Sequence, residues 1–259
     1  MKAVIPAAGL GKRFRPWTFG NAKENLPVID PNTGEFTSTI SLVTKEAISA
    51  QLHDILLVIS PAKFAIPQHL IELGQSNHSD YCLHTTCQPS PRGLGDAVLC
   101  AESFIGQDSA FAVLLGDDFY DINPLPPLIR SYERVKSGKF GGALSVMPVS
   151  TEETKRYGIV GILNESEPRI TQFAEKPQSN PPSNLAITGR YILSRSVFDY
   201  IRRVAPDSRN EIGLTPALEL MLKDGFEFYA MKIPGIRYDA GDPSGWHRAI
   251  TDIGRKFHT

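Results

Sequence analysis

Cysteine is scarce in this sequence, and long apolar runs are absent from its amino terminus. Its 259 residues include only three cysteines, Cys82, Cys87 and Cys100, with no Cys-x-x-Cys spacing among them. An odd, scattered set of this kind is typical of buried or idle thiols in a reducing cytoplasm. The amino terminus has neither a secretory-signal layout nor an apolar run of bilayer length. We therefore expect a cytoplasmic protein with no membrane partner.

Neither the net charge nor the placement of histidine points to a function. The formal net charge of −1 gives no general attraction to nucleic acid, so any basic site must be local. The six histidines lack the spacing of metal ligands and have no nucleophile motif beside them. This pattern argues against Ser/His or Cys/His catalysis.

Short apolar runs alternate with helical patterns along the chain, which is typical of an α/β fold with a mainly parallel sheet. The apolar runs predict strands at 2–7, 54–60, 110–116, 141–149 and 185–194. Helical spacing predicts helices at 37–52, 93–104 and 215–225, and proline-rich stretches predict loops at 123–127 and 176–184. A glycine inside the last strand indicates a bulge or a close backbone approach. No clear linker interrupts the pattern, so we expect one domain over residues 1–259.

The segment AVIPAAGLGKRFRPWT, residues 3–18, begins as an apolar strand and continues into a glycine turn and then cations. It does not fit a dinucleotide fingerprint, because Phe14 stands where the third glycine belongs. It does not fit a Walker A loop either, because Pro6 and Arg13 occupy two of the required positions. The missing third glycine argues against a nicotinamide-dependent oxidoreductase.

The same turn is nevertheless suited to phosphate. Backbone N–H groups at a turn that follows a strand can point at an anion. Lys12, Arg13 and Arg15 come directly after the turn, and Lys23 is close enough in sequence to reach the same place. These cations predict a site for several phosphates, while an ordinary tight turn with solvated cations is the alternative reading.

Carboxylates follow two of the apolar runs. Asp117 and Asp118 come at the end of a strand, where open α/β sheets bind ligands, and only one of them can face a site. Asp239 lies in GIRYDAGDPSGW. Such hard carboxylates suit Mg²⁺ that bridges phosphates, although turn formation explains them as well. Glu175 and Lys176 in FAEKPQ are either a sugar- and phosphate-binding pair or the solvated end of a strand.

Nine segments occur in one order along the chain and resemble the blocks of one enzyme family. They are AAGLGKRFRPWT, AKENLPV, GLGDAVLCA, LLGDDF, YGIV, AEKP, PSNLAITGRYIL, NEIGLTPAL and RYDAGDPSGW. The set resembles the sugar-nucleotide pyrophosphorylases, most of all the bacterial glucose-1-phosphate uridylyltransferase branch, and it is also similar to the thymidylyltransferase branch. The resemblance implies a Rossmann-like, mixed and mainly parallel sheet flanked by helices, the GT-A-like fold of nucleotide-diphospho-sugar transferases.

The resemblance also implies an activity, namely the formation of UDP-glucose and pyrophosphate from UTP and glucose 1-phosphate with Mg²⁺ as the cofactor. Residues 1–120 would mainly bind the nucleotide, and residues 121–259 would mainly bind the sugar phosphate. The protein would form a homo-oligomer. The sugar phosphate would attack the α-phosphorus in line, so the enzyme needs no nucleophilic side chain. The alternatives are a thymidylyltransferase using dTTP, an enzyme for a modified sugar 1-phosphate, and a non-catalytic sugar-nucleotide sensor.

A role for each matching residue follows from the resemblance. The implied catalytic residues are Arg13, Lys23 and Lys176. The implied nucleotide-binding residues are Ala8, Gly9, Gly11, Glu24, Gln88, Gly93 and Asp117. The implied sugar-binding residues are Gly158, Glu175, Asn184 and Gly189, and the implied Mg²⁺ ligands are Asp117 and Asp239.

Several features depart from the family pattern. Lys12 and Ala240 stand where the family usually carries Thr, and Pro216 stands where it usually carries Asp. The segment DPNTGEFTSTI, residues 30–40, replaces a shorter family segment. The stretch QPSPRGL, residues 88–94, reads more like the thymidylyltransferase branch, so the choice between UTP and dTTP stays open.

Overall fold

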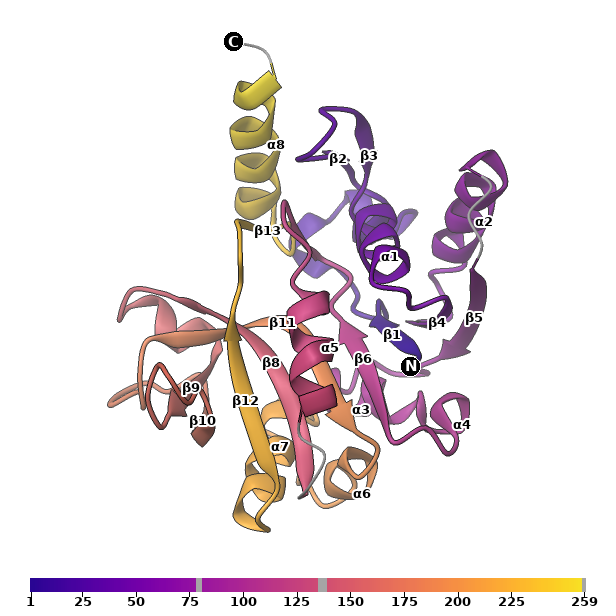
Figure 1. The fold of residues 1–259 in the computed structure, drawn as a ribbon. Helices are drawn as coiled ribbons and strands as arrows, with labels where there is room; N and C mark the ends of the chain where they lie inside the picture. Colours follow the sequence, from indigo (N-terminus) through magenta and orange to yellow (C-terminus); the bar gives the residue numbers. More distant parts are fainter. Residues whose placement is uncertain (78–80, 135–138, 258–259) are drawn as a thin grey trace. The chain divides into compact units, whose positions relative to one another are not determined.

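The computed structural model describes residues 1–77, 81–134 and 139–257, and the chain divides into two compact units (Figure 1). Unit 1 consists of Arg92–Val113 and Pro124–Ile233 together with Met1, and unit 2 of Lys2–Pro91, Leu114–Asn123 and Pro234–Thr259. Each unit is therefore assembled from separate stretches of sequence. Two of the six histidines, His78 and His258, lie outside the described residues. The expectation of a single domain stays a prediction.

Unit 2 contains a parallel sheet that follows directly from three runs of the sequence. Its strands are β1 (Ala3–Pro6), β4 (Asp54–Ile59) and β5 (Cys82–Cys87). Ala3 pairs with Ile55, and Ile55 pairs in turn with Leu83. Almost every residue of β1 and β4 is buried, which is why both strands read as continuous apolar runs rather than as alternating patterns.

The remaining elements of unit 2 are short strands, short helices and three longer helices. The strands are β2 (Pro27–Ile29), β3 (Phe36–Ser38), β7 (Asp118–Tyr120) and β13 (Arg237–Asp239). The α-helices are α1 (Thr39–Ser49), α2 (Ala65–Asn77) and α8 (Pro243–Phe257), and the 3₁₀ helices are η1 (Lys12–Phe14), η2 (Trp17–Phe19) and η3 (Lys23–Asn25). Ser38 begins α1 as its N-cap, because its Oγ accepts a hydrogen bond from the Ser41 N–H at 3.2 Å.

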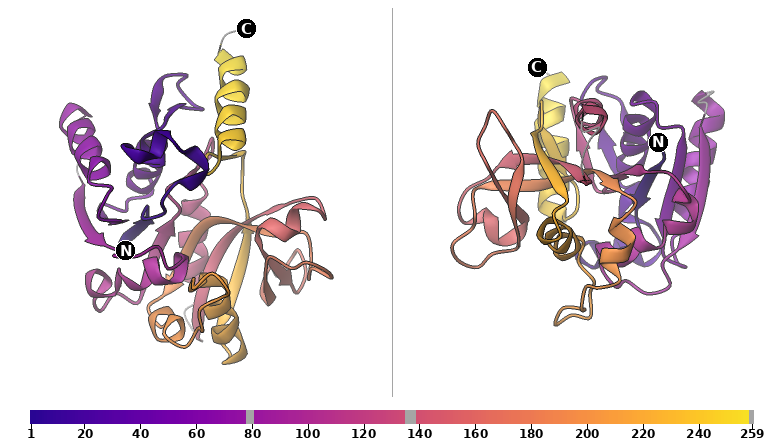
Figure 2. Two further views of the ribbon diagram at one scale, coloured as in Figure 1. Left: turned by 180° about the vertical axis from the view of Figure 1, so that it is seen from behind. Right: turned by 60° about the horizontal axis from the view of Figure 1, so that its bottom comes forward.

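Unit 1 contains a mixed sheet with helices packed on it. Its strands are β6 (Ala110–Leu114, the last residue of which belongs to unit 2), β8 (Phe140–Pro148), β9 (Gly158–Ile162), β10 (Ile170–Glu175), β11 (Leu185–Ser194) and β12 (Glu227–Lys232). Strands β9 and β10 pair antiparallel, as do β11 and β8, whereas β12 runs parallel to β8. Its helices are α3 (Leu94–Leu99), α4 (Glu102–Ile105), α5 (Leu125–Arg134), α6 (Val197–Ile201), α7 (Leu214–Lys223) and η4 (Glu153–Arg156). Helices α6 and α7 pack together in the orange part of the chain (Figure 2).

Most of the predicted elements are confirmed, and two are corrected. The expected helix at 93–104 is two helices, α3 and α4, with a break at Cys100 and Ala101. The expected loop at 123–127 is wrong from Leu125 onward, because α5 begins there with two prolines in its first turn. A first turn tolerates proline, since its N–H groups have no partner within the helix.

The glycine inside β11 has the effect that the sequence predicts. Gly189 has φ +79°, and the pairing of β11 with β8 shifts register between Ile187 and Tyr191. The bulge is confirmed. The thiols of Cys82 and Cys87 are exposed rather than buried, and none of the three cysteines is in a disulfide.

Among the described residues, no helix is both long and apolar enough to cross a membrane.

An apolar face of α8 completes the core of unit 2. Ala249 and Ile253 are buried on this face, and Trp246 and Ile250 pack beside them. They meet a cluster that includes the stacked rings of Phe119 and Tyr238, whose centroids lie 5.2 Å apart, and residues of β2 and α1. The indole N–H of Trp246 also donates to the Pro27 carbonyl at 2.8 Å. The helix α8 is thereby attached to the strand β2.

The unusual segment 30–40 contains the turn of a hairpin, the strand β3 and the first residues of α1, and the turn contacts the same helix. Its backbone closes between Asp30 N–H and Glu35 C=O at 2.8 Å, and β2 and β3 pair on either side (Figure 1). A Cβ placed on Gly34 would lie 2.8 Å from the ring of Phe257 at the end of α8. Gly34 therefore packs closely against the end of α8.

Ile253→Ala is expected to lower the free energy of unfolding by about 2–5 kcal/mol, because it leaves a cavity in the core that α8 completes. Urea unfolding followed by circular dichroism measures this loss. Asp252→Ala changes the exposed neighbour on the same helix and is expected to shift stability by no more than about 0.5 kcal/mol. Equal effects of the two substitutions would contradict this account of the core.

Candidate functional site

The glycine loop after β1 is held open by its own contacts. Gly11 has φ +59°, in the left-handed region that favours glycine, and its carbonyl accepts a hydrogen bond from Thr18 Oγ1 at 2.9 Å. A Cβ on Gly11 would lie 3.0 Å from the Thr18 methyl carbon, whereas nothing lies within 4 Å of a Cβ on Gly9. Gly11 therefore shapes the turn, and the backbone at Gly9 borders open space.

Lys23 and Asp117 form an ion pair between the end of this loop and the segment that follows β6. The ammonium of Lys23 donates to Asp117 Oδ2. Burial acts to lower the pKa of Lys23, but the charges of Asp117 and Glu24 outweigh it and raise that pKa above its ordinary value. Burial likewise acts to raise the pKa of Asp117, and the contact with Lys23 reverses the shift and lowers it. Both groups are therefore charged at neutral pH.

Asp118 has a different partner from Asp117, which lies in the turn just before β7. Arg237 donates to Asp118 Oδ1 at 2.7 Å and to Asp239 Oδ2 at 3.2 Å. Burial acts to lower the pKa of Arg237, but these carboxylates raise it well above its ordinary value. The expectation that only one of Asp117 and Asp118 can enter a common site fits this geometry. Arg237 itself was missed, although it stands two residues before Asp239 in a segment singled out in the sequence.

The carboxylates of Asp117 and Asp239 meet at Gly241. A Cβ on Gly241 would lie 3.0 Å from Asp117 Oδ2 and 3.0 Å from Asp239 Oδ1. The Gly241 N–H donates to Asp239 Oδ1 at 2.9 Å, and the Ala240 N–H donates to the Asp117 carbonyl at 2.9 Å. Two hard oxygen donors thus converge beside a residue without a side chain. Within the described residues no cluster of three or more acidic, His or Cys ligands forms a metal site.

The cations of the loop point in several directions. Arg13 has 71% of its side chain exposed and lies 3.7 Å from Asp242 Oδ2. Arg15 lies over the ring of Phe19, 5.1 Å from its centroid. Lys12 belongs to η1, and its role remains without a structural explanation. The structure therefore pairs Lys23 directly with Asp117, while Arg13 pairs with the half-buried Asp242.

Glu24 and Gln88, to which the family resemblance gives nucleotide-binding roles, are both buried in unit 2. Glu24 Oε2 accepts a hydrogen bond from Lys63 Nζ at 2.6 Å. Gln88 follows β5, and its N–H donates to the Ile59 carbonyl at 2.8 Å. Lys63 was missed, because nothing in the sequence near it signals a partner 39 residues away.

In unit 1, Glu175 and Lys176 lie together with Gly158. Gly158 pairs with Glu175 across β9 and β10, and a Cβ on Gly158 would lie 3.4 Å from Glu175 Oε2 and 3.0 Å from Thr215 Oγ1. Lys176 Nζ lies 3.1 Å from Glu175 Oε1. The pair lies where β10 ends. This position fits both a sugar- and phosphate-binding pair and the solvated end of a strand.

Three other predicted residues of unit 1 have clear backbone roles. A Cβ on Gly93 would lie 2.6 Å from the Ile212 carbonyl oxygen, so close packing alone requires glycine there. The Asn184 carbonyl accepts from the Val149 N–H at 2.9 Å, and Gly189 forms the bulge of β11. Their contacts to a ligand stay predictions.

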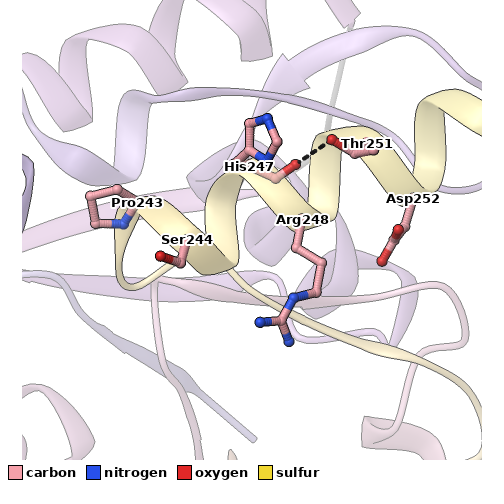
Figure 3. Close-up of a pocket in the computed structure, with 6 residues that line it drawn as sticks. All are labelled: Pro243, Ser244, His247, Arg248, Thr251 and Asp252. Carbon is pink, nitrogen blue, oxygen red and sulfur yellow. Dashed lines mark hydrogen bonds between the residues drawn. The ribbon is translucent and has the colours of Figure 1, made fainter.

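A separate pocket lies along α8 and contains none of the predicted site residues (Figure 3). It is lined by Pro243, Ser244, His247, Arg248, Thr251 and Asp252. Thr251 Oγ1 donates to the His247 carbonyl at 2.9 Å within the helix. The lining thus comes from a single helix, which is why this pocket is not the candidate site.

Comparison with known proteins identifies the family of this chain. The nucleotidyl transferase family model matches residues 2–256. A UTP–glucose-1-phosphate uridylyltransferase of Streptococcus pneumoniae serotype 4 is 37% identical, with 98% of this chain and 90% of the relative covered.

Solved structures agree over nearly the whole chain. A UDP-glucose pyrophosphorylase in complex with UDP-glucose superposes with a TM-score of 0.86 at 30% identity, and the match covers 98% of each chain. A putative glucose-1-phosphate thymidylyltransferase from Bacillus anthracis superposes with a TM-score of 0.81 at 25% identity, over 98% of this chain and 95% of that one. These likenesses confirm the expected mixed α/β fold and the resemblance stated from the sequence.

Lys23→Met is expected to destabilise the protein in a pH-dependent way. In the wild type the lowered pKa of Asp117 adds stability that is lost only as pH falls below the ordinary value of about 3.9. Without Lys23, burial raises the pKa of Asp117, so its ionisation opposes folding as pH rises. The deficit against wild type should grow from about pH 4 to about pH 7 and reach about 3–5 kcal/mol in urea unfolding.

Lys223→Met is the matched control for this prediction. Lys223 pairs with Glu219 at 2.6 Å on the surface of α7, so its loss should cost under about 1 kcal/mol at every pH. A Lys23→Met deficit that stays equally small and flat would show that the Lys23–Asp117 pair adds no stability.

Proposed function

Because this chain belongs to the nucleotidyl transferase family, we propose that it converts UTP and glucose 1-phosphate to UDP-glucose and pyrophosphate. The observation that carries the proposal is the meeting of Lys23, Asp117 and Asp239 in unit 2, next to an open glycine loop. A uridylyltransferase relative at 37% identity and a structural neighbour holding UDP-glucose support the choice of substrates.

The chemistry explains why the sequence contains no recognisable nucleophile. A phosphate oxygen of glucose 1-phosphate attacks the α-phosphorus of UTP in line. A P–O bond forms there while the bond to the β-phosphate breaks, and pyrophosphate leaves with the electron pair. The attacking phosphate is already anionic, so no side chain has to remove a proton. The protein's contribution is positioning and neutralisation of charge.

Unit 2 carries the groups suited to the triphosphate. The backbone of Ala8, Gly9 and Gly11 would hold phosphate through its N–H groups, since the space above Gly9 is open. Lys23 is held in place by Asp117 and would stabilise the charge that develops on the reacting phosphates. Arg13, with most of its side chain in solvent, would bind the same phosphates.

Asp117 and Asp239 would hold a divalent metal ion, as nucleotidyltransferases generally do, and we propose Mg²⁺. The donor set fits this ion, which is usually bound by one or two carboxylates together with substrate phosphates. Gly241 leaves room between the two carboxylates. The bound ion would neutralise phosphate charge. Arg237 would keep the Asp239 carboxylate in place.

Unit 1 carries the residues proposed for the sugar phosphate. Lys176 would bind its phosphate, and Glu175 would accept hydrogen bonds from sugar hydroxyls, with Gly158 leaving space beside it. Asn184 and Gly189 complete the proposed sugar contacts. We propose in addition that the protein acts in the cytoplasm as a homo-oligomer.

A thymidylyltransferase using dTTP is the second candidate, and a nucleotidyltransferase for a modified sugar 1-phosphate is a separate alternative. The thymidylyltransferase is favoured by the stretch 88–94 and by the structural likeness to a putative thymidylyltransferase. A non-catalytic sugar-nucleotide sensor is disfavoured, since Lys23, Asp117 and Asp239 are all present and brought together.

A substrate panel tests the function. The protein with Mg²⁺ is expected to release pyrophosphate from UTP and glucose 1-phosphate at least about tenfold more efficiently than from dTTP or from other sugar phosphates, a difference of about 1.4 kcal/mol. Removal of the metal with EDTA should abolish turnover, and added Mg²⁺ should restore it. No turnover with UTP, but turnover with dTTP, would replace the first candidate by the second.

Arg13→Ala is expected to lower kcat/KM for UTP by about 10²–10³, because one electrostatic donor to the phosphates is lost. Steady-state pyrophosphate release measures the change. Arg255→Ala removes an exposed charge from α8 and should leave the rate unchanged. An unchanged rate in Arg13→Ala as well would mean that Arg13 does not contact the triphosphate.

A further inference from the structure

Lys63 is a buried cation of unit 2 that the proposed reaction does not use. It lies between β4 and α2, and only 6% of its surface is exposed. Its backbone is fixed on both sides, since its N–H donates to the Ser60 carbonyl at 3.0 Å and its carbonyl accepts from the Ile66 N–H at 3.2 Å. The side chain therefore starts from a rigid point and reaches inward.

The ammonium of Lys63 joins the two ends of the glycine loop. It donates to the Ala7 carbonyl at 2.9 Å and to Glu24 Oε2 at 2.6 Å. Ala7 stands just before the loop backbone proposed to hold phosphate, and Glu24 stands just after Lys23. The Ala7 N–H is also bonded to the Val58 carbonyl at 2.8 Å, so Ala7 is held by both of its peptide groups.

The carboxylate of Glu24 is buried and pairs with the Lys63 ammonium. Only 2% of its surface is exposed. A Cβ on Gly116 would lie 3.5 Å from Glu24 Cγ and 3.3 Å from the Pro6 carbonyl, so Gly116 packs closely beside this side chain. Burial lowers the pKa of Lys63, and the Glu24 charge acts against that shift. A buried carboxylate without its cation would be strongly unfavourable.

We propose that Lys63 is a positioning residue of the nucleotide site, because it holds the Ala7 carbonyl and the Glu24 carboxylate at a fixed spacing across the base of the loop. The loop backbone then already has the conformation in which its N–H groups and the Lys23 ammonium can bind a nucleoside triphosphate. The proposal rests on the proposed function. It assigns Lys63 no contact with the substrate.

Lys63 could have a purely structural role or a positioning role, and the two roles predict different effects of mutation. The structural role concerns only the cost of an unpaired buried charge, and neutralising both partners removes that cost. The positioning role includes the Ala7 carbonyl, which Glu24 does not supply with a partner. The double variant Glu24→Gln/Lys63→Met therefore separates the two roles, with Glu24→Gln alone as its reference.

The test measures UTP binding by titration calorimetry in the presence of Mg²⁺ and without sugar phosphate, together with KM values and melting temperatures. Lys63→Met is expected to weaken UTP binding at least about tenfold and to raise KM for UTP in step, since pre-organisation of the loop is lost. KM for glucose 1-phosphate at saturating UTP should change less than about twofold. Lys45→Met, which removes a cation paired with Asp30 at 3.6 Å in the same unit, should leave UTP binding unchanged.

The double variant should recover melting temperature relative to Lys63→Met but bind UTP at least about fivefold more weakly than Glu24→Gln. Equal UTP affinity of the double variant and Glu24→Gln would overturn the proposal, whether or not Lys63→Met folds. If the wild type binds UTP without turnover, the proposed function fails while the affinities still decide the role of Lys63. If it binds only dTTP, the same series is measured with dTTP, and binding of neither nucleotide overturns both proposals.

Discussion

The ion pair between Lys23 and Asp117 is the contact on which the site in unit 2 depends. It joins residues 94 positions apart in the sequence, one in the loop after β1 and one after β6. Each charge makes the burial of the other possible, because either one alone would be expelled toward solvent or neutralised. The loop and the two carboxylates at Gly241 are thereby kept together before any ligand arrives.

Further ion pairs flank the Lys23–Asp117 pair on both sides. Next to Lys23, Glu24 is matched by Lys63, and beyond Asp117 the carboxylates of Asp118 and Asp239 share Arg237. Opposite charges alternate, so the site is preorganised without a large net charge. A triphosphate that enters meets donors that are already oriented, and the reorganisation needed at the moment of reaction is small.

The sequence predicts the fold through its local patterns and the site through the ends of its strands. Buried strands such as β1 and β4 are evident because apolar residues run without interruption, and Asp117 stands where such a run ends. The break between α3 and α4 and the start of α5 at Leu125 were missed, since a helical pattern or a proline-rich stretch does not by itself define a boundary. The family resemblance, rather than spacing, supplied most of the proposed ligand roles.

Lys63 and Arg237 show why the rest of the site could not be predicted. Each is a single cation, and a main partner of each lies far away in the sequence, so only folding brings the two together. Lys63 bonds to residues 56 and 39 positions away, and Arg237 to one 119 positions away. Gly34 is similar, because its contact with Phe257 depends on the far end of the chain.

The packing of α8 on β2 and β13 also determines when unit 2 can finish folding. During synthesis, Val28, Ile29 and Leu42 leave the ribosome long before Ala249 and Ile253, which cover them. A nascent chain that has reached only residue 233 holds every residue of unit 1 but exposes part of the core of unit 2. Because such distant contacts close late, the proposed nucleotide site belongs to the unit that is completed last.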